Sequence, residues 1–248
     1  MVLAVLIGNS RAVAAWMKGT LVLRRLIVPT DFLRRGPSAL AWAAKLRGMG
    51  AGGMIVASVV PTVDPFLRKA VRKTFGIAPQ FVTHQTKLGI KVKVKKPAQV
   101  GADRLANAVA ANKFYGAPSI VVDYGTGTTF DVLDQGGAYC GGAILPGIGI
   151  SLRALHDFTA KIPKVEFKRV PFTIGKTTEE AVRSGVYHGA LGTTRELLRG
   201  IRKELGAQAP AVATGGWCRE FEHSGLFKRI EPDLTLKGLS LIWQNRLA

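Results

Sequence analysis

The first half of the chain contains several short apolar runs of strand length. Residues 1–28 predict two or three strands, and residues 54–60 predict another that ends at Pro61. Residues 80–94 predict short strands. In the basic run of residues 91–96, lysine and valine alternate as far as Lys95. This would place Lys91, Lys93 and Lys95 on one strand face and the two valines on the other, the pattern of a protected edge strand.

Helical spacing of apolar residues separates these runs. It predicts three helices in the first half, at residues 39–46, 63–75 and 102–114. The last is the clearest, because Leu105, Val109 and Ala110 share one face.

From about Pro118 the order begins again with strands. Short apolar runs predict strands at residues 120–123, 128–133, 138–145 and 211–214. Apolar spacing and glycine breaks predict helices at residues 148–158, 177–205, 217–222 and 234–246, of which 177–205 is either one long helix or a bent pair. Each half therefore starts with strands and then alternates helix and strand, so we predict an α/β fold with two similar halves, residues 1–115 and 116–248.

Composition narrows the class of protein. Hydrophobic residues make up 47% of 248 residues, enough for a sizeable core, and no apolar run reaches the roughly 18 residues of a membrane span. The apolar start lacks the basic segment of a signal peptide. Cys140 and Cys218 form no CxxC or Cys/His cluster, which argues against disulfides and structural zinc and predicts a cytoplasmic protein.

The net charge of +19 admits two interpretations. It could serve an anionic ligand or nucleic acid, or it could be a solvated basic surface. The basic residues are spread along the chain without a nucleic-acid-binding motif, so we favour the surface and expect neither nucleic acid nor membrane as a partner.

A turn rich in glycine and hydroxyl groups occurs twice, about half a chain apart. Gly8-Asn9-Ser10 follows the first strand, and Gly125-Thr126-Gly127-Thr128 follows residues 120–123. Aligned on the first glycine of each turn, Asp123 corresponds to Leu6. Glycine lets backbone N–H groups approach phosphate oxygens, and hydroxyls add donors, so the repeat predicts a duplicated fold that binds a polyphosphate.

Other candidate motifs do not match the full pattern of a phosphate loop, a metal site or a nucleophile elbow. The stretch Gly175-Lys176-Thr177 resembles the end of a P-loop, but Val170 stands where the first glycine is required. The four histidines have no metal-ligand spacing, and no GxSxG nucleophile elbow is present.

Five stretches in this order resemble the type III pantothenate kinases, a family that includes homologues described as Bordetella-type accessory factors. They are GADRLANAVAA, VVDYGTGTTFDV, GGAILPGI, LHDFTAKIPKVE and PDLTLKGL, and the resemblance covers nearly the whole chain. It implies the duplicated ribonuclease-H-like lobes, with mixed sheets, of the actin-like ATPase fold. It also implies ATP-dependent phosphorylation of pantothenate, the first step of coenzyme A biosynthesis.

The resemblance assigns the pantothenate-binding residues. Gly101, Ala102, Asp103 and Arg104 open a helix, and Asp103 would be the general base on the primary hydroxyl. Arg104 offers a planar fork of donors to the substrate. Thr178 matches a threonine that reaches pantothenate across the family's dimer interface, which implies a homodimer or a heteromer with a paralogous subunit.

The resemblance also assigns the nucleotide and ion sites. The residues expected to bind ATP are Gly8, Asn9, Ser10, Gly125, Thr126, Gly127, Thr128, Gly215 and Gly216. Asp123 matches the ligand of a monovalent cation, K⁺ or NH₄⁺.

Leu6 departs from the family, which has an aspartate there that would hold Mg²⁺. Leucine cannot bind Mg²⁺, so two hypotheses remain. The chain is either a kinase whose Mg²⁺ is held mainly by nucleotide and water, or a degenerate kinase-fold subunit that regulates or completes a paralogue. Because Asp103, Arg104, Asp123 and Thr178 are retained, we favour the kinase.

Overall fold

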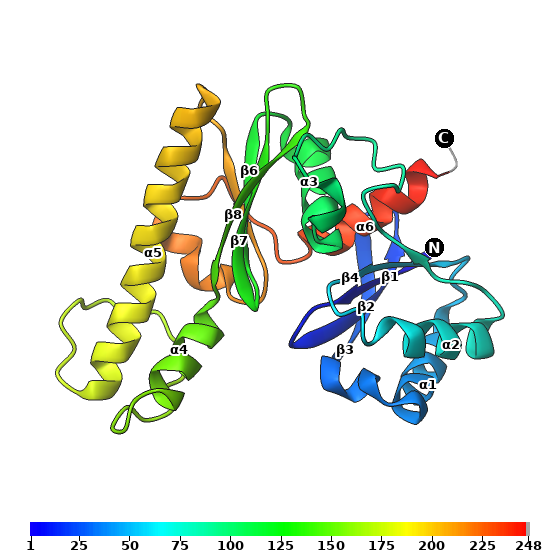
Figure 1. Cartoon of the computed structure of the whole chain (residues 1–248), viewed down its shortest axis with the longest axis horizontal. Coiled ribbons are helices and arrows are strands. Elements are labelled where there is room, and N and C mark those ends of the chain that lie inside the picture. Colours follow the sequence, from blue (N-terminus) through cyan, green and yellow to red (C-terminus); the bar gives the residue numbers. More distant parts are fainter. Residues whose placement is uncertain (247–248) are drawn as a thin grey trace. The chain divides into compact units, whose positions relative to one another are not determined.

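The computed structural model describes residues 1–246, except the side chains of residues 48 and 49, and its chain forms two compact units. Unit 1 comprises Met1–Phe114 together with the segment from Asp233 onward, and unit 2 comprises Tyr115–Pro232 (Figure 1). Each unit is built on its own five-stranded sheet.

The sheet of unit 1 has the order β3-β2-β1-β4-β5. Its strands are β1 (Val2–Ile7), β2 (Arg11–Lys18), β3 (Leu21–Pro29), β4 (Met54–Ser58) and β5 (Gln80–Phe81). The central strand β1 pairs antiparallel with β2 and parallel with β4, so the sheet is mixed.

Helices cover both faces of this sheet because side chains alternate along β1. Val2, Ala4 and Leu6 pack in a cluster with residues of α3 (Ala102–Tyr115) and α6 (Leu234–Asn245). The alternate residues of β1, Leu3, Val5 and Ile7, pack in a second cluster with residues of α1 (Gly36–Lys45) and α2 (Asp64–Phe75). These two helices lie side by side in Figure 1. Three short 3₁₀ helices complete the unit: η1 (Thr30–Arg34), η2 (Leu46–Met49) and η3 (Pro97–Gln99).

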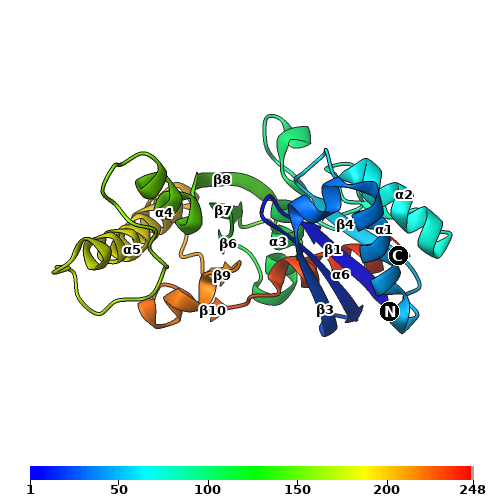
Figure 2. The same ribbon diagram turned by 90° about the horizontal axis from the view of Figure 1, so that it is seen from below.

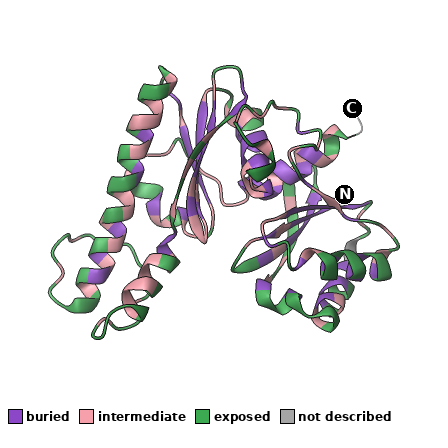
Figure 3. Ribbon diagram, viewed as in Figure 1, coloured by how far each residue is buried: buried purple, intermediate pink, exposed green. Residues whose placement is uncertain are grey.

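The sheet of unit 2 has the order β10-β9-β6-β7-β8, which can be followed in Figure 2. Its strands are β6 (Ser119–Tyr124), β7 (Gly127–Leu133), β8 (Tyr139–Pro146), β9 (Ala211–Thr214) and β10 (Arg229–Ile230). The helical elements are α4 (Ile148–Asp157), α5 (Thr178–Leu205) and the 3₁₀ helix η4 (Cys218–Ser224). Strands β6, β7 and β9 are largely buried, whereas exposed positions recur along β8 and α5 (Figure 3).

The two sheets are copies of one plan, which confirms the predicted duplicated α/β fold. In each, the first strand pairs antiparallel with the second and parallel with the fourth. Leu6 pairs with Val13 and Ala57 in unit 1. Asp123 pairs with Thr129 and Thr214 in unit 2, so Leu6 and Asp123 occupy equivalent positions.

The prediction of a lysine-rich edge strand was wrong. Residues 91–96 contain only an isolated bridge at Val92 and no strand. Lys91, Lys93 and Lys95 are nevertheless exposed, while Val92 packs against the core beside α3 and α6. A segment that lies along a core shows alternating burial without ladder hydrogen bonds, so the period of two did not indicate a sheet here.

Two other elements differ from the sequence prediction. The short helix expected at residues 217–222 is the 3₁₀ helix η4. The C-terminal helix α6 belongs to unit 1, because Gly238 lies so close to the carbonyl of Ala106 in α3 that a Cβ atom would overlap it. Across residues 1–246, no helix is both long enough and apolar enough to cross a membrane.

Candidate functional site

The first glycine turn of unit 1 connects β1 to β2. The N–H of Gly8 donates to the carbonyl of Arg11 at 3.0 Å, and this bond closes the turn. Asn9 and Ser10 are exposed at its tip. The predicted phosphate turn therefore presents its amide and hydroxyl side chains to solvent.

Leu6 lies two residues before this turn and is partly buried. It packs against the core cluster that contains Ala102 and Leu105 of α3. Its side chain is therefore on the face of the sheet covered by the helix that carries Asp103. An aspartate at this position would add a carboxylate to that face.

Asp103 occupies the first turn of α3 and is partly buried. Burial raises its pKa above the ordinary value, and this effect outweighs both the hydrogen bond from the Arg104 N–H, at 2.8 Å, and the Arg104 charge. A carboxylate with a raised pKa is a stronger base than one in water.

Gly101 fits closely beneath Asp103. A Cβ atom at Gly101 would lie 2.5 Å from Asp103 Oδ1 and 3.5 Å from Val59 Cγ1. The N–H of Val59 in turn donates to the carbonyl of Ile7, the residue before the first turn. Gly101 thus lets the start of α3 approach the end of β1, which brings Asp103 and the Gly8 turn to the same end of the sheet.

The second glycine turn, in unit 2, surrounds Asp123. The N–H of Gly125 donates to the carbonyl of Gly127 at 3.1 Å. A Cβ atom at Gly125 would lie 3.3 Å from Asp123 Oδ1, and one at Gly215 would overlap that oxygen. Gly215 also has φ +90°, which favours glycine. Both glycines therefore hold backbone close to the Asp123 carboxylate.

Thr214 adds a hydroxyl beside Asp123 that the sequence analysis missed. The two residues are partners in the parallel pair β6–β9, so their side chains lie on the same face. Thr214 is fully buried, and its Oγ1 has no hydrogen-bond partner among the residues described. Buried hydroxyls are normally paired, so this oxygen is available to a bound ion or water.

The remaining predicted nucleotide residues lie around the same turn. Thr126 is partly buried, Thr128 is buried, and Gly216 is exposed. A Cβ atom at Gly147 would overlap the carbonyl group of Thr126, so Gly147 packs directly on the turn.

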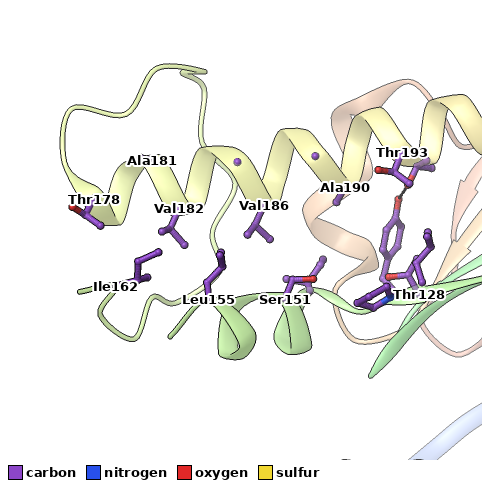
Figure 4. Close-up of a pocket in the computed structure, with 17 residues that line it drawn as sticks. Thr128, Ser151, Leu155, Ile162, Thr178, Ala181, Val182, Val186, Ala190 and Thr193 are labelled. Carbon is purple, nitrogen blue, oxygen red and sulfur yellow. Dashed lines mark hydrogen bonds between the residues drawn. The ribbon is translucent and has the colours of Figure 1, made fainter. Parts of the chain in front are cut away.

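Thr178 stands apart from that turn, at one end of an apolar groove within unit 2. The groove has a volume of about 660 Å³ and lies between α4 and α5. Figure 4 shows Thr178 at one end, with Val182 and Val186 of α5 facing Leu155 and Ile162. The neighbouring Thr177 caps α5 by accepting a hydrogen bond from the Glu180 N–H, so the Gly175-Lys176-Thr177 stretch begins a helix and is not a phosphate loop.

A divalent metal would find few protein ligands. Among residues 1–246 no group of three or more His, Cys, Asp or Glu side chains could hold an ion. The oxygen donors at the first turn are the neutral groups of Asn9 and Ser10. These residues could contact Mg²⁺ only as neutral ligands, so the ion would be bound mainly by nucleotide phosphates and water.

Solved structures define the fold class. A protein of Campylobacter jejuni assigned to the Baf family of transcriptional activators matches with a TM-score of 0.61 and 18% identity, over 99% of this chain and 98% of its own. A ROK hexokinase of Thermus thermophilus matches with a TM-score of 0.51 and 16% identity, over 97% of each chain. The chain therefore has the actin-like ATPase fold that the sequence predicted.

Sequence relatives define the family within that class. The family model described as type III pantothenate kinase matches residues 2–200. Proteins named type III pantothenate kinase are 40% identical in Rhodospirillum rubrum, over 98% of this chain and 97% of the relative, and 38% identical in Acidiphilium cryptum, over 95% and 91%. The chain belongs to the type III pantothenate kinase family, which confirms the resemblance.

Proposed function

We propose that this protein transfers the γ-phosphoryl group of ATP to the primary hydroxyl of pantothenate, giving 4′-phosphopantothenate for coenzyme A biosynthesis. The observation that carries this proposal is Asp103, a partly buried carboxylate with a raised pKa, in a chain 38–40% identical over nearly its full length to named type III pantothenate kinases. The relatives support this activity and give no support to a degenerate regulatory subunit.

Asp103 would accept the proton of the substrate hydroxyl. Phosphoryl transfer has a loose transition state, so the base mainly orients the nucleophile and takes its proton late. Arg104 would bind the carboxylate or another polar group of pantothenate through its guanidinium. The close fit of Gly101 against Asp103 supports a fixed position for the base.

The glycine turns would bind the phosphates of ATP through backbone N–H groups and hydroxyls. In unit 1 these residues are Gly8, Asn9 and Ser10; in unit 2 they are Gly125, Thr126, Gly127 and Thr128. Gly215 and Gly216 would let the adenosine approach the backbone. Mg²⁺ would offset charge on the transferring phosphoryl group, without a carboxylate from the first turn because Leu6 replaces it.

Asp123 would bind the monovalent cation, K⁺ or NH₄⁺. The unpartnered Thr214 hydroxyl lies on the same face of the sheet as Asp123, and the backbone at Gly125 and Gly215 approaches its carboxylate closely. We expect activity to require K⁺ or NH₄⁺ and Asp123→Ala to remove both this requirement and most activity. Equal initial rates in buffers containing only Na⁺ and in K⁺ buffers would contradict this cation role.

The active form would be a dimer, with a second copy of this chain on the α4–α5 groove. Gly185, Gly189 and Gly192 are exposed on α5, and a Cβ atom at each would meet nothing within 4 Å. Glycine costs about 1 kcal/mol relative to alanine in a helix, so the fold of one chain does not explain these residues. A closely packed partner would explain them, and Thr178 lines the same groove.

The compartment would be the cytoplasm, where ATP is available. Both cysteines are free thiols, which suits a reducing compartment.

The direct test is ATP-dependent phosphorylation of pantothenate by the purified chain with Mg²⁺ and K⁺. We expect turnover by the wild type and at least a hundredfold less by Asp103→Asn. No turnover by a folded wild type that carries both ions would refute the proposed function for this chain alone. Turnover that appears only with a co-expressed paralogue would instead support the heteromer.

A further inference from the structure

The residue that follows the third strand contacts the glycine turn in both units. Pro29 ends β3 and pairs with Arg11, and Pro146 ends β8 and pairs with Gly127. In each unit the paired residue is the first of the second strand, so the two prolines are equivalent. Thr30 and Gly147, the residues that follow them, are therefore equivalent as well.

Thr30 holds the first turn by two hydrogen bonds. Its Oγ1 donates to the carbonyl of Gly8 at 2.6 Å, and its N–H donates to the carbonyl of Ser10 at 3.1 Å. Thr30 is fully buried, so water does not compete for these contacts. The side chain and backbone of one residue thus tie both sides of the turn to the end of β3.

Gly147 contacts the second turn by close packing instead. A Cβ atom there would overlap the Thr126 carbonyl group and lie 2.7 Å from the carbonyl oxygen of Gly125. Its φ of −74° is open to any residue, so the requirement for glycine comes from space. The two units hold equivalent turns by different means at the same place.

The contacts of Thr30 determine which way a peptide group of the turn faces. In a trans peptide the C=O and N–H point in opposite directions. Because the Gly8 carbonyl points to Thr30, the N–H of Asn9 points away from it. A phosphate is attracted to N–H groups and repelled by carbonyl oxygens, so this orientation favours an anion on the side away from Thr30.

We propose that Thr30 is a positioning residue that holds the first turn in the conformation that binds the phosphates of ATP. The inference rests on the proposed kinase function. Thr30 does not touch the nucleotide; it acts through the carbonyls of Gly8 and Ser10. Loss of its hydroxyl frees the Gly8–Asn9 peptide to rotate, and a displacement of about 1 Å can lower activity about a hundredfold.

The test compares Thr30→Val, Thr30→Ser and Ser240→Ala in the intact chain. Ser240 is a matched control because its buried hydroxyl donates, at 2.5 Å, to the carbonyl of Gly19 in the β2–β3 turn, at the other end of β2. We expect Thr30→Val to raise the KM for ATP about tenfold or more with little change in the KM for pantothenate. Thr30→Ser and Ser240→Ala should keep the wild-type KM for ATP, and hydrogen exchange over residues 8–11 should rise only in Thr30→Val.

Each outcome decides the role of Thr30. An unchanged KM for ATP in Thr30→Val, or an equal rise in Ser240→Ala, overturns it even if the variant is less stable. If Thr30→Val does not fold, Thr30→Cys, whose thiol is a weaker donor, replaces it, and a wild-type KM for ATP in that variant overturns the role. A wild type that neither binds ATP nor phosphorylates pantothenate refutes the kinase function and with it the positioning role. If the wild type is active, an unchanged KM for ATP in Thr30→Val refutes the positioning role alone.

Discussion

At the scale of single residues, Asp103 and Leu6 determine how this kinase would work. Asp103 lies in the first turn of α3, where burial raises the pKa of its carboxyl group. Leu6 fills, with an apolar side chain, the position equivalent to Asp123 in the other unit. The site expected to bind the pantothenate hydroxyl thus keeps its carboxylate, Asp103, while the first glycine turn has leucine where the second has a carboxylate.

Asp103→Asn should lower the rate and raise the stability. The rate should fall about 10²–10⁴-fold because the amide cannot accept the hydroxyl proton. The folded pKa lies above the unfolded one, so the folded state binds more protons, and the ionised carboxylate lowers stability at pH values above both. The variant should therefore melt at a higher temperature at pH 7, and the difference should vanish in acid below the ordinary pKa of 3.8.

Two measurements check these expectations. The kcat/KM of the wild type should fall as pH drops through the raised pKa, since protonation removes the base. If Asp103→Asn keeps the wild-type kcat, Asp103 is not the base. If the variant melts at a lower temperature than the wild type at pH 7, the ionised carboxylate does not destabilise the fold.

Leu6→Asp should lower the Mg²⁺ concentration needed for half-maximal activity. The new carboxylate would add a ligand, direct or through water, to an ion otherwise held by nucleotide and water. It should also lower stability by about 1–3 kcal/mol, because Leu6 packs against the core. Leu6→Asn is the control: it loses the same packing but adds no charge. Identical Mg²⁺ titrations for the two variants would show that no ion binds near residue 6.

At the scale of elements, the ends of the third strands determine the shape of both turns. β3 and β8 each end in a proline, and the next residue packs on the turn between the first two strands. Proline ends a strand because it lacks an N–H donor, so the chain leaves the sheet at the same point in each copy. The helical element that follows each strand, η1 or α4, therefore starts beside the turn, with Thr30 or Gly147 in contact with it.

Gly147→Ala should disturb the second turn, whereas Gly149→Ala should not. The methyl group at residue 147 would overlap the Thr126 carbonyl, so we expect a loss of about 1–3 kcal/mol in stability and a higher KM for ATP. At residue 149 a Cβ atom meets nothing within 4 Å, and alanine favours the helix. Thermal melting and ATP kinetics of both variants check this; equal behaviour would mean that the turn adapts.

At the scale of the whole molecule, the proposed dimer would place a second copy of the chain on the exposed glycine face of α5. Gly185 and Gly189 of this face line the apolar groove, which ends at Thr178, the residue expected to act in the partner's site. A two-fold dimer would use this surface twice.

Complementation tests the shared site. Thr178→Ala and Asp103→Asn should each be nearly inactive, but a mixture that exchanges subunits should recover about a quarter of wild-type activity, since half the dimers then carry one intact site. Val186→Glu should give a monomer by sedimentation, whereas Leu21→Glu, at an exposed position of unit 1, should leave the assembly unchanged. No recovery by exchanging dimers would place Thr178 outside the partner's site.

The sequence by itself determined the order of elements, the duplicated plan and most candidate residues. Strands and helices follow from the spacing of apolar side chains, which is a local property. The repeat was visible because Gly8 and Gly125 follow similar strands. Asp103, Asp123 and Thr178 came from motifs that can be compared residue by residue with the family.

Only the tertiary structure decided which segments pack together. The alternating pattern in residues 91–96 could not show whether a neighbouring strand was present. In the described chain this segment forms only an isolated bridge at Val92 and no strand. The return of α6 to unit 1 depends on the contact of Gly238 with Ala106, more than a hundred residues earlier in the chain. Thr30, Gly147 and Thr214 act through such distant contacts, because a hydrogen bond or close approach joins residues that share no local pattern.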